Sequence, residues 1–325
     1  MSDITKIPGN VVTKTMRDKI QLYYGPPGTW KTTTAVGDME TTLLGAFEIG
    51  YKFIPGVKAI NLTNWAGLKD IVRQLSTDEA KEMYKTFVID TIGLAYKACI
   101  DFICAREGVV SIGKIPYGQG YDMAKNEFEK VMHKIPQMGY GLIMIAHSAE
   151  LNNEETGVSV KVDINKRPSS VIKGMADFIL YARKEQKDGS NEETNRAVYA
   201  YSETVNPNIE VKSRARFFPN RVEFTYENLM SSLEYAVKEQ DKFFGVESSK
   251  EADFTVYKQT EINLQTLQND VKAIAERLIA LGETDKVVST LNSQLHGVKV
   301  TATNKSHVPV LYAIRDELLE IESKR

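Results

Sequence analysis

A glycine-rich turn between an apolar run and a threonine-rich segment constrains this chain more than any other feature. Residues 25–32 read GPPGTWKT, which follows the pattern G-x-x-x-x-G-K-[ST] at all but one position. The apolar run at 20–24 predicts a strand before the turn, and Lys31 opens a predicted helix. Backbone N–H groups of such a loop, together with the helix behind it, form a concave donor site for a polyphosphate. The turn therefore predicts a phosphate-binding loop in an α/β fold.

We expect this loop to bind ATP with Mg²⁺. In such a loop the lysine, Lys31, reaches the β- and γ-phosphates, and the hydroxyl of Thr32 coordinates the magnesium ion. The residues expected to contact the nucleotide run consecutively along the chain: Gly25, Pro26, Pro27, Gly28, Thr29, Trp30, Lys31, Thr32 and Thr33.

Trp30 is the one departure, because it stands where the pattern has its second glycine. A glycine there turns without a Cβ penalty and lets the backbone approach the phosphate closely. We expect Trp30 to adopt ordinary dihedrals with its indole pointing away from the phosphates. The substitution also predicts slow ATP turnover.

Three polar residues near the ends of predicted strands are candidates for the chemistry. The run at 86–90 delivers Asp90 at its C-terminal end, where a carboxylate can coordinate magnesium beside a phosphate loop. Glu48 ends the strand predicted at 42–48 and is a candidate for polarising the attacking water. His147 follows the run at 141–146, where it could sense the γ-phosphate. The alternatives are a solvent-facing acid for Glu48 and a structural histidine for His147.

The order of apolar segments predicts the fold class. Strands are expected at 20–24, 42–48, 57–62, 86–90, 141–146 and 175–182, with helices at 65–75, 92–105 and 121–138. Nearly all-apolar strands that alternate with helices indicate a mainly parallel sheet covered on both faces. The polar stretch 150–167 predicts a long mobile loop. Residues 196–201 and 209–217 are expected to pair around a turn at 206–208.

Length and composition are consistent with a large α/β core and a small appendage. We divide the 325 residues into a leader (1–18), an ATPase domain of the RecA-like P-loop type (19–240), a linker (241–256) and a small helical C-terminal domain (257–325). The net charge of −2 does not indicate a basic nucleic-acid coat. The only two cysteines, Cys99 and Cys104, are expected to be buried thiols. Without a signal peptide or an apolar membrane span, a cytoplasmic protein is expected.

Several ordered motifs together resemble a known family. The segments YGPPGTWKTT, KTFVIDTIGLAYK, YGQGYDMAKNEF, GYGLIMIAHSAE and MADFILYAR are similar to phage nucleotide-binding proteins of the RecA/RadA class, which includes the Sak-type single-strand annealing ATPases. The resemblance covers about residues 19–238. It implies a DNA-dependent ATPase that binds single-stranded DNA and promotes annealing or strand exchange as a ring or filament, in the host cytoplasm. A single-strand-binding protein is a further candidate partner.

The resemblance also assigns two sets of basic residues. The stretch 150–167 falls where this class has a DNA-binding loop, and its cations are Lys161, Lys166 and Arg167. The segment 211–216 is similar to a strand whose basic residues reach a neighbouring subunit's ATP. Its cations alternate along the sequence and would share one strand face: Lys212, Arg214 and Arg216. A solvated loop and a charged edge strand are the alternatives.

Two other functions share these motifs. One is a helicase or helicase-loader-like motor, which unwinding of a forked duplex would distinguish. The other is an ATP-gated DNA-binding scaffold in which Trp30 has removed most of the turnover.

Overall fold

The computed structural model describes residues 12–153, 157–187, 196–203, 208–246 and 264–323. These residues fall into two compact units, one within 10–254 and one within 255–325. In the part of the chain that the structure describes, no helix is long and apolar enough to cross a membrane.

A mainly parallel sheet forms the centre of the larger unit. Its parallel strands lie in the order β7 (Phe178–Gln186), β1 (Ile20–Gly25), β5 (Gly141–Asn153), β4 (Thr86–Asp90), β2 (Thr42–Ala46) and β3 (Lys58–Asn61). The antiparallel strands β8 (Arg196–Tyr201) and β10 (Arg221–Glu223) extend the sheet beyond β7. The strands that the sequence predicts before residue 150 are therefore all present.

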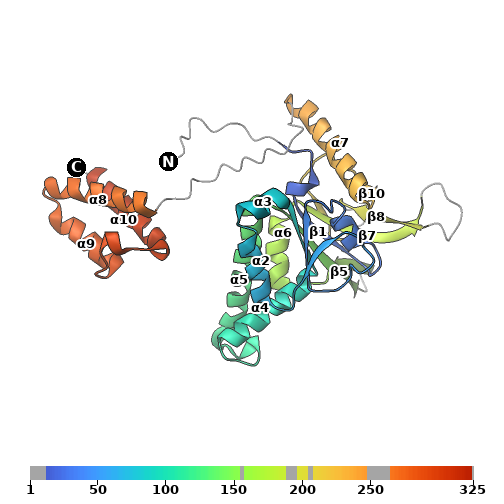
Figure 1. The fold of residues 1–325 in the computed structure, drawn as a ribbon, viewed down its shortest axis with the longest axis horizontal. Helices are drawn as coiled ribbons and strands as arrows, with labels where there is room; N and C mark the ends of the chain where they lie inside the picture. Colours follow the sequence, from blue (N-terminus) through green and yellow to red (C-terminus); the bar gives the residue numbers. More distant parts are fainter. Residues whose placement is uncertain (1–11, 154–156, 188–195, 204–207, 247–263, 324–325) are drawn as a thin grey trace. The chain divides into compact units, whose positions relative to one another are not determined.

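Helices cover both faces of this sheet (Figure 1). On one face lie α2 (Trp65–Gln74), α4 (Ile92–Arg106), α5 (Gln119–Gln137) and α6 (Lys166–Met175), and on the other α1 (Lys31–Ala35) and α7 (Tyr226–Phe244). The short α3 (Asp78–Met83) follows α2. Alternation along β1 shows the two cores, because Leu22 and Tyr24 join one apolar cluster whereas Tyr23 joins the other. The predicted α/β fold class of a P-loop NTPase is confirmed.

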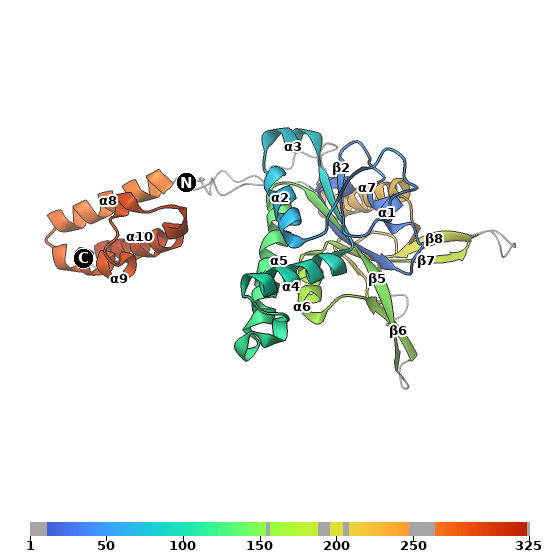
Figure 2. The ribbon, with the colours of Figure 1, turned by 60° about the horizontal axis from the view of Figure 1, so that its bottom comes forward.

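The expectation of a mobile loop at 150–167 is wrong for the residues that the structure describes. Strand β5 continues past His147, and its residues 148–153 pair antiparallel with β6 (Gly157–Val162). We call this hairpin the arm, and Figure 2 shows it extending beyond the rest of the sheet. Helix α6 then begins at Lys166. The valines at 158, 160 and 162 alternate with polar residues, which is the short strand signal that the polar composition concealed.

The expected pairing of 196–201 with 209–217 is also wrong. Strand β8 lies between β7 and β10, and only Lys212–Ser213 (β9) of the second segment is a strand, paired with β7. The start of the segment 209–217 pairs with the arm instead, because Ile209 forms a β-bridge to Val160. Of the predicted turn, residues 206 and 207 lie outside the described residues.

In the described part of the smaller unit, residues 264–323, three α-helices pack around one apolar cluster. They are α8 (Leu264–Ala280), α9 (Thr284–Leu295) and α10 (Val308–Ser323), and all three lie within the helical domain predicted at 257–325. Helix α7 runs on to Phe244, so the linker predicted from 241 begins inside a helix. The helix continues because residues 234–244 have no proline or glycine to end it, and Gly245 closes it in the left-handed conformation.

Candidate nucleotide site

The phosphate loop connects β1 to α1 at the carboxyl edge of the sheet. Its first glycine, Gly25, has φ of 154°, and a Cβ there would lie 2.1 Å from the carbonyl oxygen of Ala182 on β7. The neighbouring strand therefore packs directly against the start of the loop. This close approach leaves no space for a side chain, which explains why the loop begins with glycine.

Lys31 is buried in this loop and turns back onto it. Its ammonium donates hydrogen bonds to the carbonyl oxygens of Gly25 at 2.9 Å and Pro26 at 2.8 Å, and to the hydroxyl of Thr29 at 3.2 Å. Burial lowers the pKa of Lys31 to about 8, although the nearby carboxylates of Asp90 and Glu48 oppose the shift. The loop thus holds a desolvated cation whose charge an anion would stabilise.

Trp30 keeps the backbone conformation of the glycine that it replaces. Its φ and ψ are 52° and 25°, in the left-handed region, so the expectation of ordinary dihedrals is wrong. The path of the chain between β1 and α1 fixes this conformation, because Trp30 is the N-cap of α1 and its carbonyl accepts from the amide of Thr34. The side chain is 53% exposed, which is consistent with the indole standing clear of the loop. A non-glycine residue in this region costs about 1–2 kcal/mol.

Thr32 and Asp90 meet behind the loop. The Thr32 hydroxyl donates to Asp90 Oδ2 at 2.7 Å. Asp90 is only 4% exposed, and burial raises its pKa while the Thr32 hydrogen bond opposes the shift. A divalent cation beside both oxygens would offset the cost of the buried carboxylate charge.

The donor set fits magnesium. Mg²⁺ takes oxygen ligands and usually uses one or two protein groups together with the phosphates of its substrate. Among the residues described here, no group of three or more His, Cys, Asp or Glu side chains could hold a metal by itself. Thr32 and Asp90 therefore suit a metal that arrives with a nucleotide.

Glu48 and His147 form a pair on the other side of Asp90. Their side chains, from the loop after β2 and from β5, lie 3.2 Å apart between Oε2 and Nε2, and both are partly exposed. The amides of Phe47 and Glu48 donate to the carbonyl oxygen of Asp90, which holds this loop against β4. The carboxylate thus lines the same cavity as the phosphate loop and is paired with the histidine.

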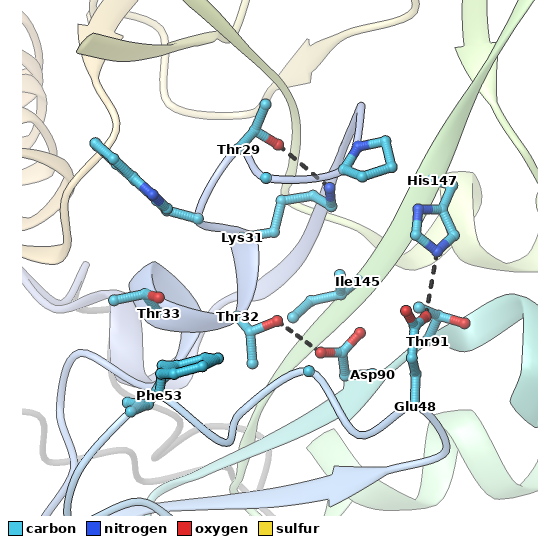
Figure 3. Close-up of a pocket in the computed structure, with 15 residues that line it drawn as sticks. Thr29, Lys31, Thr32, Thr33, Glu48, Phe53, Asp90, Thr91, Ile145 and His147 are labelled. Atoms are coloured by element: carbon cyan, nitrogen blue, oxygen red, sulfur yellow. Dashed lines mark hydrogen bonds and ion pairs between the residues drawn. The ribbon is translucent and has the colours of Figure 1, made fainter. Parts of the chain in front are cut away.

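A cavity of about 510 Å³ brings these groups together (Figure 3). Its lining includes seven of the nine loop residues and all three strand-end candidates: Pro27, Gly28, Thr29, Trp30, Lys31, Thr32, Thr33, Glu48, Asp90 and His147. Gly25 and Pro26 do not line it and instead supply the carbonyls that hold Lys31. The cavity therefore gathers five candidate residues that lie up to 116 positions apart in sequence: Lys31, Thr32, Glu48, Asp90 and His147. The sequence suggested each of their roles separately.

Sequence reasoning missed Phe53 at the mouth of the same cavity. Phe53 lies in the loop between β2 and β3 and is 98% exposed. The loop is anchored on both sides of it, because Tyr51 and Ile54 pack against the core and the Ile54 amide donates to the Tyr51 carbonyl. An isolated aromatic residue in a loop has no periodic signal, so the sequence offered no indication of its position.

The candidate DNA-binding cations lie along the arm and just after it. Lys161 is exposed on β6, and Lys166 and Arg167 begin α6. The Arg167 guanidinium lies 4.7 Å from the ring centroid of Tyr121 and 3.8 Å from the Asp122 carboxylate. These residues are placed on the surface, but contact with DNA stays a prediction.

The three cations expected on one strand face do not share it. Strand β9 ends at Ser213, and the chain turns because the Phe218 amide bonds to the Ala215 carbonyl. Lys212 donates to the Lys173 carbonyl at 2.8 Å, and Arg214 pairs with Asp177 at 3.0 Å. Arg216 lies 4.5 Å from the Phe243 ring centroid. Each cation therefore has a partner within its own chain, and the repulsion argument for their action on a neighbouring subunit fails. Their role in trans stays an untested prediction.

Comparisons with known proteins identify a family and two similar proteins. Residues 17–215 match the family model described as an AAA domain. The chain is 28% identical over 335 positions to YorG of Bacillus subtilis (strain 168), an SPbeta prophage-derived uncharacterized protein, with 98% of each chain covered. It is also similar to the crystal structure of the RadB recombinase at 13% identity and a TM-score of 0.38, with 65% of this chain and 90% of that chain covered.

Proposed function

The chain belongs to the AAA domain family, and from this premise we propose that it is a magnesium-dependent ATPase that binds single-stranded DNA and promotes annealing or strand exchange in phage recombination. The observation that carries the ATPase part is the 510 Å³ cavity, which gathers Lys31, Thr32, Asp90, Glu48 and His147. A desolvated cation and an oxygen pair suited to magnesium face the same opening, as phosphoryl transfer requires.

Each side chain of the cavity has a definite task in this proposal. Lys31 exchanges its bonds to the loop carbonyls for the triphosphate, which is a stronger acceptor. Thr32 and Asp90 hold the magnesium ion, which neutralises charge on the β- and γ-phosphates when bound. Glu48 orients the attacking water, and His147, 3.2 Å away, keeps that carboxylate in place and faces the γ-phosphate.

The mouth of the cavity offers a surface for the base. Phe53 and Trp30 are both more than half exposed and both line the opening. Exposed aromatic rings beside a phosphate site suit stacking on a nucleobase. We propose that at least one of the two rings contacts the base of ATP.

The DNA part of the proposal rests on the arm and on the prophage relative. The arm projects from the sheet directly after His147 (Figure 2). Lys161 is an exposed residue of β6. Since the Asp163 amide donates to the His147 carbonyl, the base of the arm is tied to the nucleotide site. A ring or filament would present many copies of the arm to one strand. The proposal also includes membership of the Sak-type family, a single-strand-binding protein as partner and a location in the host cytoplasm.

Trp30 favours a second candidate, an ATP-gated scaffold with little turnover. A strained tryptophan at the phosphate loop, with Lys31 folded onto the loop carbonyls, is compatible with tight binding and slow hydrolysis. Tight ATP binding with negligible phosphate release would support this alternative.

The experiment that tests the proposed function follows annealing of two complementary fluorescent oligonucleotides. We expect ATP and Mg²⁺ to accelerate annealing by the wild-type protein and not by Lys31→Ala. Unwinding of a forked duplex, without acceleration of annealing, would instead indicate a helicase-type motor. Equal annealing rates with and without the protein would refute the recombination proposal.

A further inference from the structure

A second cavity of about 270 Å³ lies on the helical face of the sheet, between α4, α5 and the start of α6. It shares no lining residue with the nucleotide cavity. Its lining combines aromatic and cationic side chains: Tyr96, Ile100, Tyr121, Asn165, Lys166 and Arg167. Pockets for drug-sized ligands span about 300–1,000 Å³, so this smaller cavity suits a single flat ring system.

Tyr121 and Arg167 form one wall of this cavity. The guanidinium lies 4.7 Å from the ring centroid, and Tyr121 remains 39% exposed. The ion pair of Arg167 with Asp122 is long, at 3.8 Å, and both of its side chains are exposed. The arginine is therefore held mainly over the tyrosine ring, where the two flat groups offer a stacking surface.

The other walls of this cavity present polar side-chain groups. Tyr96 is 2% exposed and packs edge-on against Phe128 at 5.3 Å. For the residues that the structure describes, the Tyr96 hydroxyl, the Asn165 amide and the Lys166 ammonium form no side-chain hydrogen bond or ion pair. A ligand that brings donors and acceptors would provide partners for these three groups.

The cavity also lies where the arm and the nucleotide site converge. Asn165 and Lys166 follow β6 after a three-residue step, and Tyr96 stands on α4, which begins two residues after Asp90.

We propose that this cavity binds one base of single-stranded nucleic acid, stacked on Tyr121 beside Arg167, with Asn165 and the Tyr96 hydroxyl facing the base edge and Lys166 facing the adjacent phosphate. The inference rests on the proposed function and deepens it, because it places one nucleotide of the strand in a defined pocket. Since every base has a π-face, this pocket tolerates different sequences.

The test uses the full chain and an oligonucleotide with a single 2-aminopurine, whose fluorescence falls when the base stacks. We expect binding of wild-type protein to quench the probe. Tyr121→Ala should lose this quenching and weaken binding by about 5- to 150-fold, the range for one base–aromatic stack. Tyr121→Phe keeps the ring and should retain both signals.

Tyr117→Ala is the matched control, because Tyr117 is a 97% exposed tyrosine four residues earlier that does not line the cavity. It should behave as wild type. Arg167→Gln provides a second variant on the exposed wall, and retained ATP binding by each variant verifies its fold.

The outcomes separate the two proposals. A wild-type protein that binds no oligonucleotide would refute the DNA-binding function itself. A wild type that binds, with Tyr121→Ala and Arg167→Gln quenching and binding equally well, would refute only the base pocket. Tyr121-dependent quenching of free 2-aminopurine deoxyribonucleotide, with the oligonucleotide unquenched, would also overturn it, because the pocket would then take a mononucleotide.

Discussion

The hydroxyl of Thr32 lies 2.7 Å from the carboxylate of Asp90, although 58 residues separate them in sequence. In space, the carboxyl end of β4 lies beside the first turn of α1. One side-chain oxygen from each element can therefore reach the same cation. A magnesium ion held there with a triphosphate would need both oxygens, so each should affect nucleotide binding.

Asp90→Asn should weaken Mg²⁺-dependent ATP binding and also lower turnover. The amide fills the same space and can still accept from Thr32, but it lacks the charge that holds the cation. The measurement is ATP affinity across a series of magnesium concentrations. Asp101→Asn, an exposed acid on α4, is the control. An unchanged magnesium dependence in Asp90→Asn would remove this residue from the metal site.

Glu48→Gln should behave differently from Asp90→Asn. The glutamine retains the shape and a hydrogen bond to His147 but no longer polarises water, so turnover should fall by about 10²–10⁴-fold with ATP affinity unchanged. Pre-steady-state phosphate release measures the chemical step, with Glu40→Gln, an exposed acid, as control. A parallel loss of affinity would make Glu48 a structural residue.

Trp30→Gly should be more stable than Trp30→Ala. Both variants lose the indole, but only glycine adopts φ of 52° without a Cβ penalty. Its greater freedom in the unfolded chain offsets part of this gain, which leaves a difference of about 0.5–1 kcal/mol in the free energy of unfolding. Urea titrations measure the difference. We expect Trp30→Gly to turn over ATP faster than wild type. Equal stability of the two variants would show that the loop does not impose a left-handed conformation at position 30.

Binding of ATP should take up a proton at alkaline pH. The pKa of Lys31 is lowered to about 8 by burial, so the free protein loses this charge as the pH rises through 8. The triphosphate stabilises the ammonium and raises its pKa, so affinity should decrease above pH 8 and remain flat below about pH 7. Calorimetry at pH 8.5 in buffers of different ionisation enthalpy counts the protons. Lys31→Arg, if it binds ATP, should take up none, and buffer-independent heats in wild type would contradict the assignment.

The cations of the arm and of α6 should contribute to the salt dependence of single-strand binding. Each phosphate contact adds a slope of about −0.7 in log K against log[salt]. A triple variant replaces Lys161, Lys166 and Arg167 by alanine. It should bind single strands more weakly, and its slope should be flatter by about 2.

The control for this triple variant removes three exposed lysines from other surfaces: Lys85, Lys97 and Lys130. It should keep the wild-type slope. An unaltered slope in the arm variant would establish that these cations are only solvated surface charges.

The sequence predicted the position of the phosphate loop and of Asp90 in the fold, because the signals for both are local. The phosphate loop joins a strand to a helix over a few residues, and Asp90 ends a fully buried strand. Their meeting follows from the parallel order of β1, β5 and β4, whose carboxyl ends share one edge.

The structural features that the sequence did not predict depend on contacts between residues that are far apart in the sequence. Strand β8 pairs with β7 and β10. No local sequence pattern shows that these strands, rather than residues 209–217, are its partners. Arg214 finds Asp177 only after β9 docks on β7. The conformation of Trp30 could not be predicted from its own preferences, because the flanking strand and helix impose it.

The most direct test of the account is steady-state phosphate release from ATP and Mg²⁺, with and without single-stranded DNA. We expect measurable turnover by wild type, stimulation by single-stranded DNA, and loss of both in Lys31→Ala with its fold intact. Lys31→Ala turnover equal to wild type would contradict the phosphate-loop assignment, and wild-type turnover indifferent to DNA would contradict the proposed coupling between the cavity and the arm.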